Sequence, residues 1–573
     1  MKHFVAEFNE IRLKSCVAAA QGQKAPSVVQ TRLQLCAYLL FACILTRVDF
    51  VLASPEDGLR PNSCQRLEGN NLSALPDAPT QLLSSVELKA TGELPAHCQI
   101  TGYVMPNIGF RMGLPDTWSG RFIEMGCGGH CGVADAEYFS GSCAAPMRKG
   151  YACLISDLGH KGKWLDGLWA YGDLQAKVDW GYRGTHVLAL AGKVIAERYY
   201  ARKPRKSYFM GCSTGGRQGL QEAQRFPWDF DGIVAGAPPI RLPELYIMFA
   251  WGYRATHTSD GHLVLATREF KLLHDAAVDM CDKDDGLVDG IISSPQTCRF
   301  RPTVLLCKTG QTKRCLNAQQ VRAAEMIYTG PATAAGQPLL SGGPLPGSEF
   351  DASLDDPSSG NWSQAYVGRE GQIGAYSVIA QEGLRYMFFD EDPGAAWKIT
   401  DFDFDRDYKR LGIMGAIYDS SNPDLRRFRD AGGKLLIYGG TDDNSVLPRM
   451  VTDYYDQVVA VVGGREKTQQ FVRLFELPGV GHCQGGPGAD VVDYLGAIEA
   501  WVEGKSPPDR LIAYHLRRSE KGVLTPVSLP PNTADVSFSR PVFPYPAHAR
   551  YSGSGDPNNE RSFEVFDASR GPN

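Results

Sequence analysis

The sequence lacks an extended basic stripe, since its densest basic group is the short run at 202–206, and it lacks any apolar run long enough to cross a membrane. It has 573 residues and a formal net charge of −5. Nucleic-acid binding needs a basic stripe, so we expect no nucleic-acid partner. A membrane-spanning helix needs about 18 or more consecutive apolar residues, so we expect no stable membrane span in the mature chain.

The first 54 residues differ from the rest in composition. Basic residues are scattered over positions 1–32, an apolar run follows at 35–45, and small residues stand at Ala53 and Ser54. This order is typical of a secretory signal peptide, and a retained anchor is the alternative. We therefore expect a secreted or periplasmic protein.

Cysteine is abundant for a cytosolic enzyme. Three of the fifteen cysteines fall within residues 1–54, which leaves an even twelve. An even number after a signal segment predicts disulfide bonds. The alternative is zinc held by Cys127 and Cys131, but no second cysteine pair with matching spacing stands nearby.

The order of apolar segments predicts an α/β fold. Strand-like and helical patterns alternate up to residue 239, which indicates a parallel sheet with crossover helices. The alternation stops over residues 240–425 and resumes with the apolar strand at 434–438. We therefore expect one α/β domain in two parts, 55–239 and 426–573, with a large insertion at 240–425.

A glycine turn at residues 211–215 follows an apolar strand and precedes a helical pattern. This is the layout of a nucleophile elbow, G-x-S-x-G, with Ser213 at its apex. With 62 glycines in the chain, chance alone can supply such a match. The function of Ser213 therefore depends on partners elsewhere in the chain.

A nucleophilic serine needs a base, and the base needs an acid that orients it. Asp442 and Asp443 follow the strand at 434–438, and His482 follows the next strand at 470–477. The order serine, acid, histidine is that of an α/β-hydrolase. Each of these loops alone is ordinarily a solvated turn, but the ordered set predicts a catalytic triad.

Two cysteines adjoin the candidate catalytic residues. Cys212 precedes Ser213 and Cys483 follows His482. A disulfide between them would fix the geometry of nucleophile and base, whereas the alternative is a pair of buried free thiols.

Three motifs together resemble the tannase and feruloyl esterase family, which includes the mono-hydroxyethyl terephthalate hydrolases. They are Gly-Cys-Ser-Thr-Gly-Gly at 211–216, Tyr-Gly-Gly-Thr-Asp-Asp at 438–443 and Gly-His-Cys at 481–483. The resemblance extends over nearly all of the mature chain. It implies an α/β-hydrolase fold with a large inserted lid domain.

The resemblance also assigns residues. The family's aspartate stands five positions after the strand tyrosine, which implies Asp443, although the loop departs from the family pattern at Gly439 and Asn444. Elbow geometry makes the Thr214 N–H one oxyanion donor. The family implies Gly129, in an early glycine turn, as the second.

An acidic loop follows Cys281 in the insertion. Aspartates around a glycine can hold Ca²⁺, although such a loop is more often simply solvated. The family resemblance implies a structural Ca²⁺ in the lid. The implied ligands are Asp282, Asp285 and Asp289 with the carbonyls of Leu287 and Ile291.

The resemblance further implies three disulfides in addition to the pair beside the triad. They are Cys281 with Cys298, Cys307 with Cys315, and Cys64 with Cys98. Pairing among cysteines 127, 131, 143 and 153 stays open.

We therefore expect a secreted serine carboxylesterase that acts through an acyl-enzyme. The resemblance implies a substrate ester of a phenolic or aromatic acid, such as a feruloyl or galloyl ester, free or linked to polysaccharide. Arg385 and Phe389 are candidates to line its binding slot. The alternatives are a lipase or peptidase on the same scaffold, or a catalytically silent, calcium-stabilised binding protein of the cell surface.

Overall fold

The computed structural model of the protein describes residues 63–67, 71–92, 94–350, 361–368, 373–504, 506–517 and 531–567. The predicted signal segment, residues 1–54, lies outside these ranges. Residues 60–573 form one compact unit.

A nine-stranded sheet runs through this unit in the order β1-β2-β3-β5-β4-β6-β7-β8-β9. Neighbours from β1 to β5 pair antiparallel, and those from β5 through β4 to β9 pair parallel. The strands are β1 (Thr80–Leu88), β2 (His97–Val104), β3 (Ile108–Pro115), β4 (Arg121–Met125), β5 (Tyr151–Ser156), β6 (Lys206–Cys212), β7 (Gly232–Gly236), β8 (Lys434–Gly440) and β9 (Val472–Leu477).

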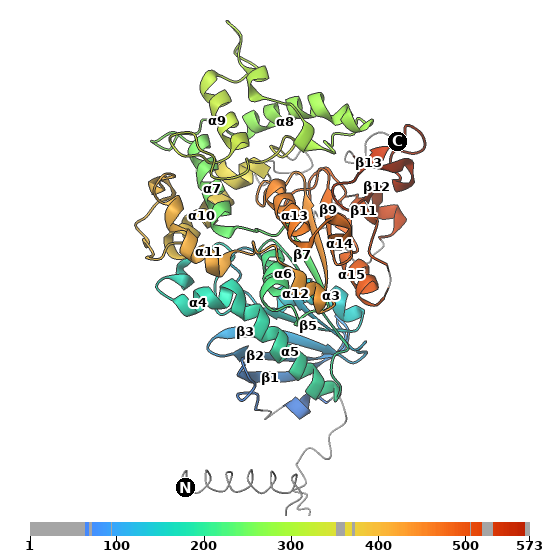
Figure 1. Ribbon diagram of the computed structural model, residues 1–573. Coiled ribbons are helices and arrows are strands. Elements are labelled where there is room, and N and C mark those ends of the chain that lie inside the picture. The colour runs from blue at the N-terminus through green and yellow to red at the C-terminus, as the bar shows by residue number, and fades with distance from the viewer. Residues whose placement is uncertain are drawn as a thin grey trace, which may run out of the picture. The chain divides into compact units, whose positions relative to one another are not determined.

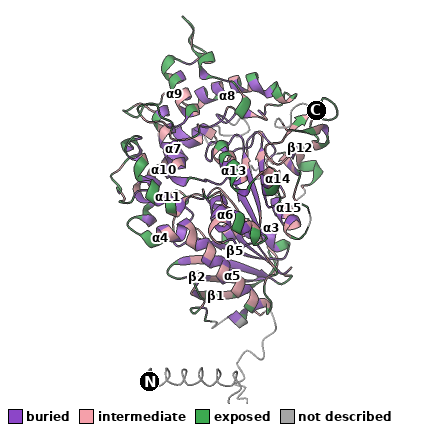
Figure 2. Cartoon of the chain, in the orientation of Figure 1, coloured by how far each residue is buried: buried purple, intermediate pink, exposed green. Residues whose placement is uncertain are grey.

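The central strands are buried because helices cover both of their faces (Figure 2). Every residue of β5 and of β7 is buried, as expected for parallel strands with near-continuous apolar sequence. One face packs against α3 (Ala136–Arg148) and α15 (Tyr494–Val502). The other packs against α5 (Gly184–Tyr200), α6 (Thr214–Arg225) and α13 (Pro448–Val462). This arrangement confirms the predicted α/β class.

Between β7 and β8 the described residues add no strand to the nine-stranded sheet. The helices of this segment are α7 (Leu242–Thr256), α8 (Thr267–Cys281), α9 (Ala318–Thr329), α10 (Ala375–Tyr386), α11 (Gly412–Tyr418) and α12 (Arg426–Asp430). Figure 1 shows α7 to α11 of this segment gathered at the top and left of the view, whereas α12 lies beside α6. The division into domains at 240 and 425 stays a prediction.

The carboxy-terminal part contains two small sheets that the sequence pattern did not indicate. One holds three strands and the other holds two. Their strands are β10 (Val491–Val492), β11 (Leu511–Leu516), β12 (Val536–Val542), β13 (His548–Tyr551) and β14 (Phe563–Phe566). The remaining α-helices of the described residues are two short ones, α4 (Leu174–Val178) and α14 (Arg465–Gln469).

Disulfide bonds join all twelve cysteines of the described residues. The four predicted pairs are confirmed, and the open pairing resolves as Cys127 with Cys131 and Cys143 with Cys153. The bond between Cys127 and Cys131 leaves no thiolate there for zinc. Among the described residues, every helix is too short or too polar to span a lipid bilayer.

Candidate active site

Ser213 stands alone between the end of β6 and the start of α6. Its backbone has φ 61° and ψ −125°, a strained conformation for a residue with a side chain. A Cβ atom on Gly211 would lie 2.7 Å from Gly215 Cα, and one on Gly216 would lie 2.1 Å from the Gly236 carbonyl oxygen. Only glycine fits at these positions, so the predicted elbow is a true sharp turn.

Asp443 and His482 meet at the ends of β8 and β9. The His482 Nδ1 lies 2.9 Å from Asp443 Oδ2. The other carboxylate oxygen, Oδ1, accepts the N–H groups of Ser445 at 2.8 Å and Val446 at 2.9 Å, and Asp443 is 1% exposed. A carboxylate can only accept, so Nδ1 carries the hydrogen and Nε2 keeps a free lone pair.

The neighbouring aspartate has a different environment. Asp442 is also buried, and its Oδ1 accepts a hydrogen bond from the Thr441 hydroxyl at 3.2 Å. The geometry therefore brings Asp443, the residue that family spacing implies, to His482. In the described part of the chain no hydrogen bond joins the Ser213 hydroxyl to His482, although both side chains line one pocket.

The disulfide between Cys212 and Cys483 links the nucleophile loop to the histidine loop. Its two Cα atoms lie 6.0 Å apart, and it joins positions separated by 271 residues. Because each cysteine adjoins a candidate catalytic residue, the bond restricts how far Ser213 and His482 can separate.

Replacing Cys212 and Cys483 together by serine is expected to lower the free energy of unfolding by about 2–4 kcal/mol and to reduce kcat at least about tenfold. The matched control is the double serine variant of Cys307 and Cys315, a bond across only 8 positions. The control should lose stability and keep its kcat, as measured by denaturant titration and steady-state kinetics. Unchanged kcat in the first variant would show that the bond does not position the two loops.

The predicted oxyanion residues lie beside Ser213. The Thr214 hydroxyl donates to the Gly129 carbonyl oxygen at 2.7 Å, and both residues line the pocket. Gly129 has φ +56°, and a Cβ atom there would lie 2.4 Å from the Trp164 carbonyl oxygen. The disulfide of Cys127 and Cys131 closes this turn, and the hydrogen bond from the Thr214 hydroxyl joins the turn to the elbow.

A pocket of about 760 Å³ opens above Ser213 and His482. Apolar side chains of the insertion form much of its wall, including Leu245 and Phe249 of α7 and Ile379 of α10. The sequence analysis did not predict these residues as part of the site. Their signal is the spacing of residues 242, 245, 246 and 249, which places one apolar stripe along a helix.

Arg385 and Phe389 do not line this pocket, which corrects the expectation from the sequence. Arg385 Nε donates to the Trp397 carbonyl oxygen at 2.7 Å, and its Nη1 donates to Glu382 at 2.9 Å. Phe389 is 1% exposed and lies beneath the guanidinium of Arg410. Both side chains are occupied by contacts within the insertion.

His130 is fully buried behind the pocket wall. Its Nδ1 lies 3.0 Å from the Asp166 carbonyl oxygen, and its Nε2 lies 2.8 Å from the Tyr246 hydroxyl. The carbonyl can only accept, so Nδ1 carries a hydrogen, and the lowered pKa of the ring leaves the imidazole neutral at pH 7. Burial lowers the pKa of His130 to about 4.

His130 is expected to make the protein less stable in acid. The unfolded chain takes up a proton on this imidazole below pH 6.5, whereas the native state does so only near pH 4. The stabilisation is thus present above pH 6.5 and is lost as the pH falls toward 4, by about 2–3 kcal/mol. Denaturant titration at pH 7.5 and 4.5 should show a shallower loss in His130→Gln than in the wild type. Equal losses would contradict the assignment.

The acidic loop of the insertion carries the three predicted carboxylates. Asp282 accepts the N–H groups of Asp289 and Gly290, and Asp285 accepts that of Leu287. Burial, and to a smaller extent the nearby charge of Asp289, raises the pKa of Asp282 and of Asp285. Hydrogen bonds to the two carboxylates partly oppose this rise. Asp289 pairs with Arg540 of β12 at 2.7 Å. The donors suit a hard cation, although Asp289 already has a positive partner.

The chain matches the family model described as "Tannase and feruloyl esterase" over residues 89–566. The mono(2-hydroxyethyl) terephthalate hydrolase of Piscinibacter sakaiensis is 31% identical over 87% of this chain and 91% of its own. A probable feruloyl esterase B-2 of Aspergillus terreus is 31% identical over 78% of this chain and 81% of its own.

A solved structure, feruloyl esterase B from Aspergillus oryzae, superposes with a TM-score of 0.73. It is 26% identical and covers 88% of this chain and 100% of its own. This likeness confirms the predicted α/β-hydrolase architecture. The chain belongs to the tannase and feruloyl esterase family and is a carboxylic ester hydrolase.

Proposed function

We propose that the protein hydrolyses esters of phenolic or other aromatic acids with Ser213 as nucleophile, His482 as base and Asp443 as the acid that orients it. The observation that carries the proposal is the 2.9 Å contact between His482 Nδ1 and Asp443 Oδ2. It leaves the His482 Nε2 lone pair on the side of the ring away from the carboxylate. The elbow and the disulfide of Cys212 and Cys483 keep Ser213 near that ring.

The reaction follows from these positions. Ser213 Oγ attacks the ester carbonyl carbon while His482 Nε2 takes its proton. The oxyanion forms beside Thr214 and Gly129, whose N–H groups are the proposed donors. His482 then gives the proton to the departing alcohol, and an acyl-enzyme remains on Ser213. Water attacks the acyl carbon with His482 again as base, which releases the acid and restores the serine.

The pocket supports an aromatic acyl group. A volume of about 760 Å³ is within the usual range for small-molecule sites, and its walls carry Phe249, Tyr376 and Trp164. The Tyr376 ring lies edge-on to His482 with centroids 6.2 Å apart. Relatives named for feruloyl and terephthalate esters agree with such an acyl group.

A panel of esters tests the substrate class. Methyl ferulate, methyl gallate and a terephthalate monoester should each be assayed beside a triglyceride and a peptide amide, with acid release followed by chromatography. We expect at least one aromatic ester to be cleaved and the triglyceride and amide to be poor substrates. Cleavage of lipid or peptide alone would overturn the aromatic class while keeping the serine chemistry.

The six disulfides are typical of a protein that folds in an oxidising compartment outside the cytosol. We therefore propose that the enzyme is secreted or periplasmic, as the composition of residues 1–54 predicts.

We also propose that Ca²⁺ stabilises the insertion through Asp282, Asp285 and Asp289. Burial raises the pKa of the buried Asp282 and of the half-buried Asp285, and a bound cation would stabilise both carboxylates in their charged form. Bound Ca²⁺ would hold the carboxylates of the acidic loop together and would take no part in the ester chemistry.

Chelation of Ca²⁺ is expected to lower the Tm by roughly 2–5 °C, with recovery when Ca²⁺ is returned. Asp285→Asn should abolish this response in differential scanning calorimetry. Asp284→Asn is the matched control, because Asp284 is exposed and is not among the implied ligands. A Tm that chelation does not move would exclude the calcium role.

A further inference from the structure

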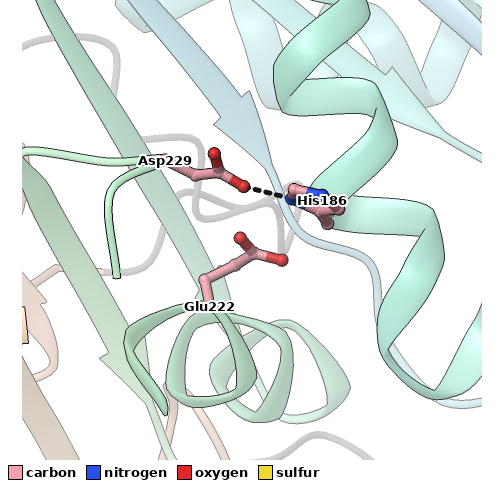
Figure 3. Close-up of side chains that lie close together, drawn as sticks. All are labelled: His186, Glu222 and Asp229. Atoms are coloured by element: carbon pink, nitrogen blue, oxygen red, sulfur yellow. Dashed lines mark hydrogen bonds and ion pairs between the residues drawn. The ribbon is translucent and has the colours of Figure 1, made fainter. Parts of the chain in front are cut away.

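A second group of polar side chains lies between the sheet and its covering helices. His186 comes from α5, Glu222 from α6 and Asp229 from the loop before β7 (Figure 3). One ligand atom from each lies within 4.8 Å of the others, and His186 Nδ1 lies 2.5 Å from Asp229 Oδ2. None of the three lines the active-site pocket. Glu222 is nine residues along α6 from Ser213, or about 13 Å at the helical rise.

The interior position of Glu222 is the unusual feature. Glu222 is 1% exposed, and among the described residues no donor reaches either carboxylate oxygen, so Glu222 can hydrogen-bond the neighbouring Asp229 carboxylate only when it is protonated. Figure 3 shows its carboxylate pointing toward Asp229 and His186. A buried polar group without a partner is costly, so a carboxylate in this position calls for a ligand or a proton.

The charges around Glu222 do not balance. Glu124 of β4 and Asp229 are each 1% exposed, so three buried carboxyl groups gather in this layer. Lys193 offers one ammonium, 3.8 Å from Asp229 Oδ1. If all three carboxyl groups are ionised, this single ammonium leaves two negative charges uncompensated, and either protons or one divalent cation can balance them.

We infer that His186, Glu222 and Asp229 bind one divalent transition-metal ion, with Zn²⁺ as the representative. An imidazole nitrogen with two carboxylates is a donor set that Zn²⁺ accepts, whereas Ca²⁺ prefers oxygen ligands alone. Ligand bonds of about 2.0–2.2 Å require these side chains to close slightly around the ion. Coordination through Nδ1 requires the hydrogen of the neutral imidazole to move to Nε2, and any proton held by the Glu222 carboxyl is released to solvent.

The site is reachable and supported by its surroundings. The His186 side chain is 14% exposed, so an ion can enter from the solvent edge of α5. The ring stacks on Phe226 with centroids 3.8 Å apart, and Lys193 Nζ donates to the Asp229 backbone carbonyl oxygen at 2.7 Å. An ion here would tie α5 and α6 to the loop before β7, behind the nucleophile elbow.

The competing account is that protons alone balance the cluster. Burial and the neighbouring carboxylates raise the pKa of Glu222, and burial with the Asp229 charge raises that of Glu124. Both groups would then be neutral without a metal. The two accounts differ in whether added Zn²⁺ binds.

The test uses the full-length protein stripped of metal, with Zn²⁺ titrated by calorimetry and the Tm measured in parallel. We expect one Zn²⁺ per chain and a raised Tm in the wild type, and at least a tenfold weaker affinity in Glu222→Gln. Ca²⁺ is kept in excess during the titration so that the acidic loop is filled, and Glu466→Gln, at an exposed position on α14, should bind Zn²⁺ as the wild type does. Equal affinity in the wild type and Glu222→Gln, or no binding to either, overturns the inference.

A second measurement keeps the inference testable if Glu222→Gln does not fold. X-ray absorption at the zinc edge of the loaded wild type should show one imidazole and oxygen ligands. A zinc environment without imidazole, or with several imidazoles, overturns the site.

Discussion

Ser213→Ala is expected to reduce kcat for an aromatic ester by roughly 10⁴- to 10⁶-fold. Without Oγ no acyl-enzyme can form, and His482 has no nucleophile to activate. Alanine also removes little else. The elbow is held through the backbone, because the Ser213 N–H donates to the Gly236 carbonyl oxygen at 2.9 Å.

The Tm of Ser213→Ala should therefore stay near that of the wild type, which separates chemistry from folding. Steady-state kinetics with methyl ferulate, or with whichever aromatic ester is cleaved, gives the rate. A variant that retains a tenth or more of the wild-type kcat would show that another group attacks the ester.

Asp443→Asn is expected to reduce kcat about 10⁴-fold, or about 5 kcal/mol of transition-state stabilisation. An amide nitrogen facing His482 Nδ1 would donate, which forces the hydrogen onto Nε2 and removes the base. The two backbone N–H groups of Ser445 and Val446 can still reach the amide oxygen, so the loop should keep its shape.

Asp442→Asn is the matched control, because it makes the same chemical change one residue away. Its carboxylate contacts the Thr441 hydroxyl rather than His482, so kcat should change by less than about tenfold. The reverse ranking of the two variants would assign the orienting role to Asp442.

Local sequence rules predicted the elements that bear the chemistry. The glycine turn around Ser213, between a strand and a helix, predicted the elbow once an aspartate and a histidine were found in order after later strands. The family spacing from the strand tyrosine selected Asp443 over its neighbour. The adjacency of Cys212 to Ser213 and of Cys483 to His482 predicted a disulfide that spans 271 positions.

Features that depend on tertiary packing were not predictable in the same way. Arg385 and Phe389 have the right residue types for a binding slot, but the position of α10 directs them to Trp397 and beneath Arg410. The pocket wall instead includes the apolar stripe of α7. Periodicity in the sequence indicates this stripe but does not indicate which part of the protein it contacts.

The buried polar cluster illustrates the same limit. His186, Glu222 and Asp229 stand 36 and 7 positions apart, and nothing in their spacing resembles a metal motif. Only the packing of α5 against α6 brings them within 4.8 Å of one another. Sequence patterns predict sites whose residues lie together in one or two loops. They do not predict sites whose residues come from separate elements that only packing brings together.

Trapping of the acyl-enzyme tests the central claim most directly. The protein is mixed with a slowly hydrolysed aromatic ester, quenched in acid within the first turnover, digested and analysed by mass spectrometry. We predict that the peptide containing Ser213 gains the mass of the acyl group, and that neither Ser213→Ala nor a sample pre-treated with a fluorophosphonate shows the gain. An active enzyme whose acyl group is found on another residue, or on none, would contradict the proposed mechanism.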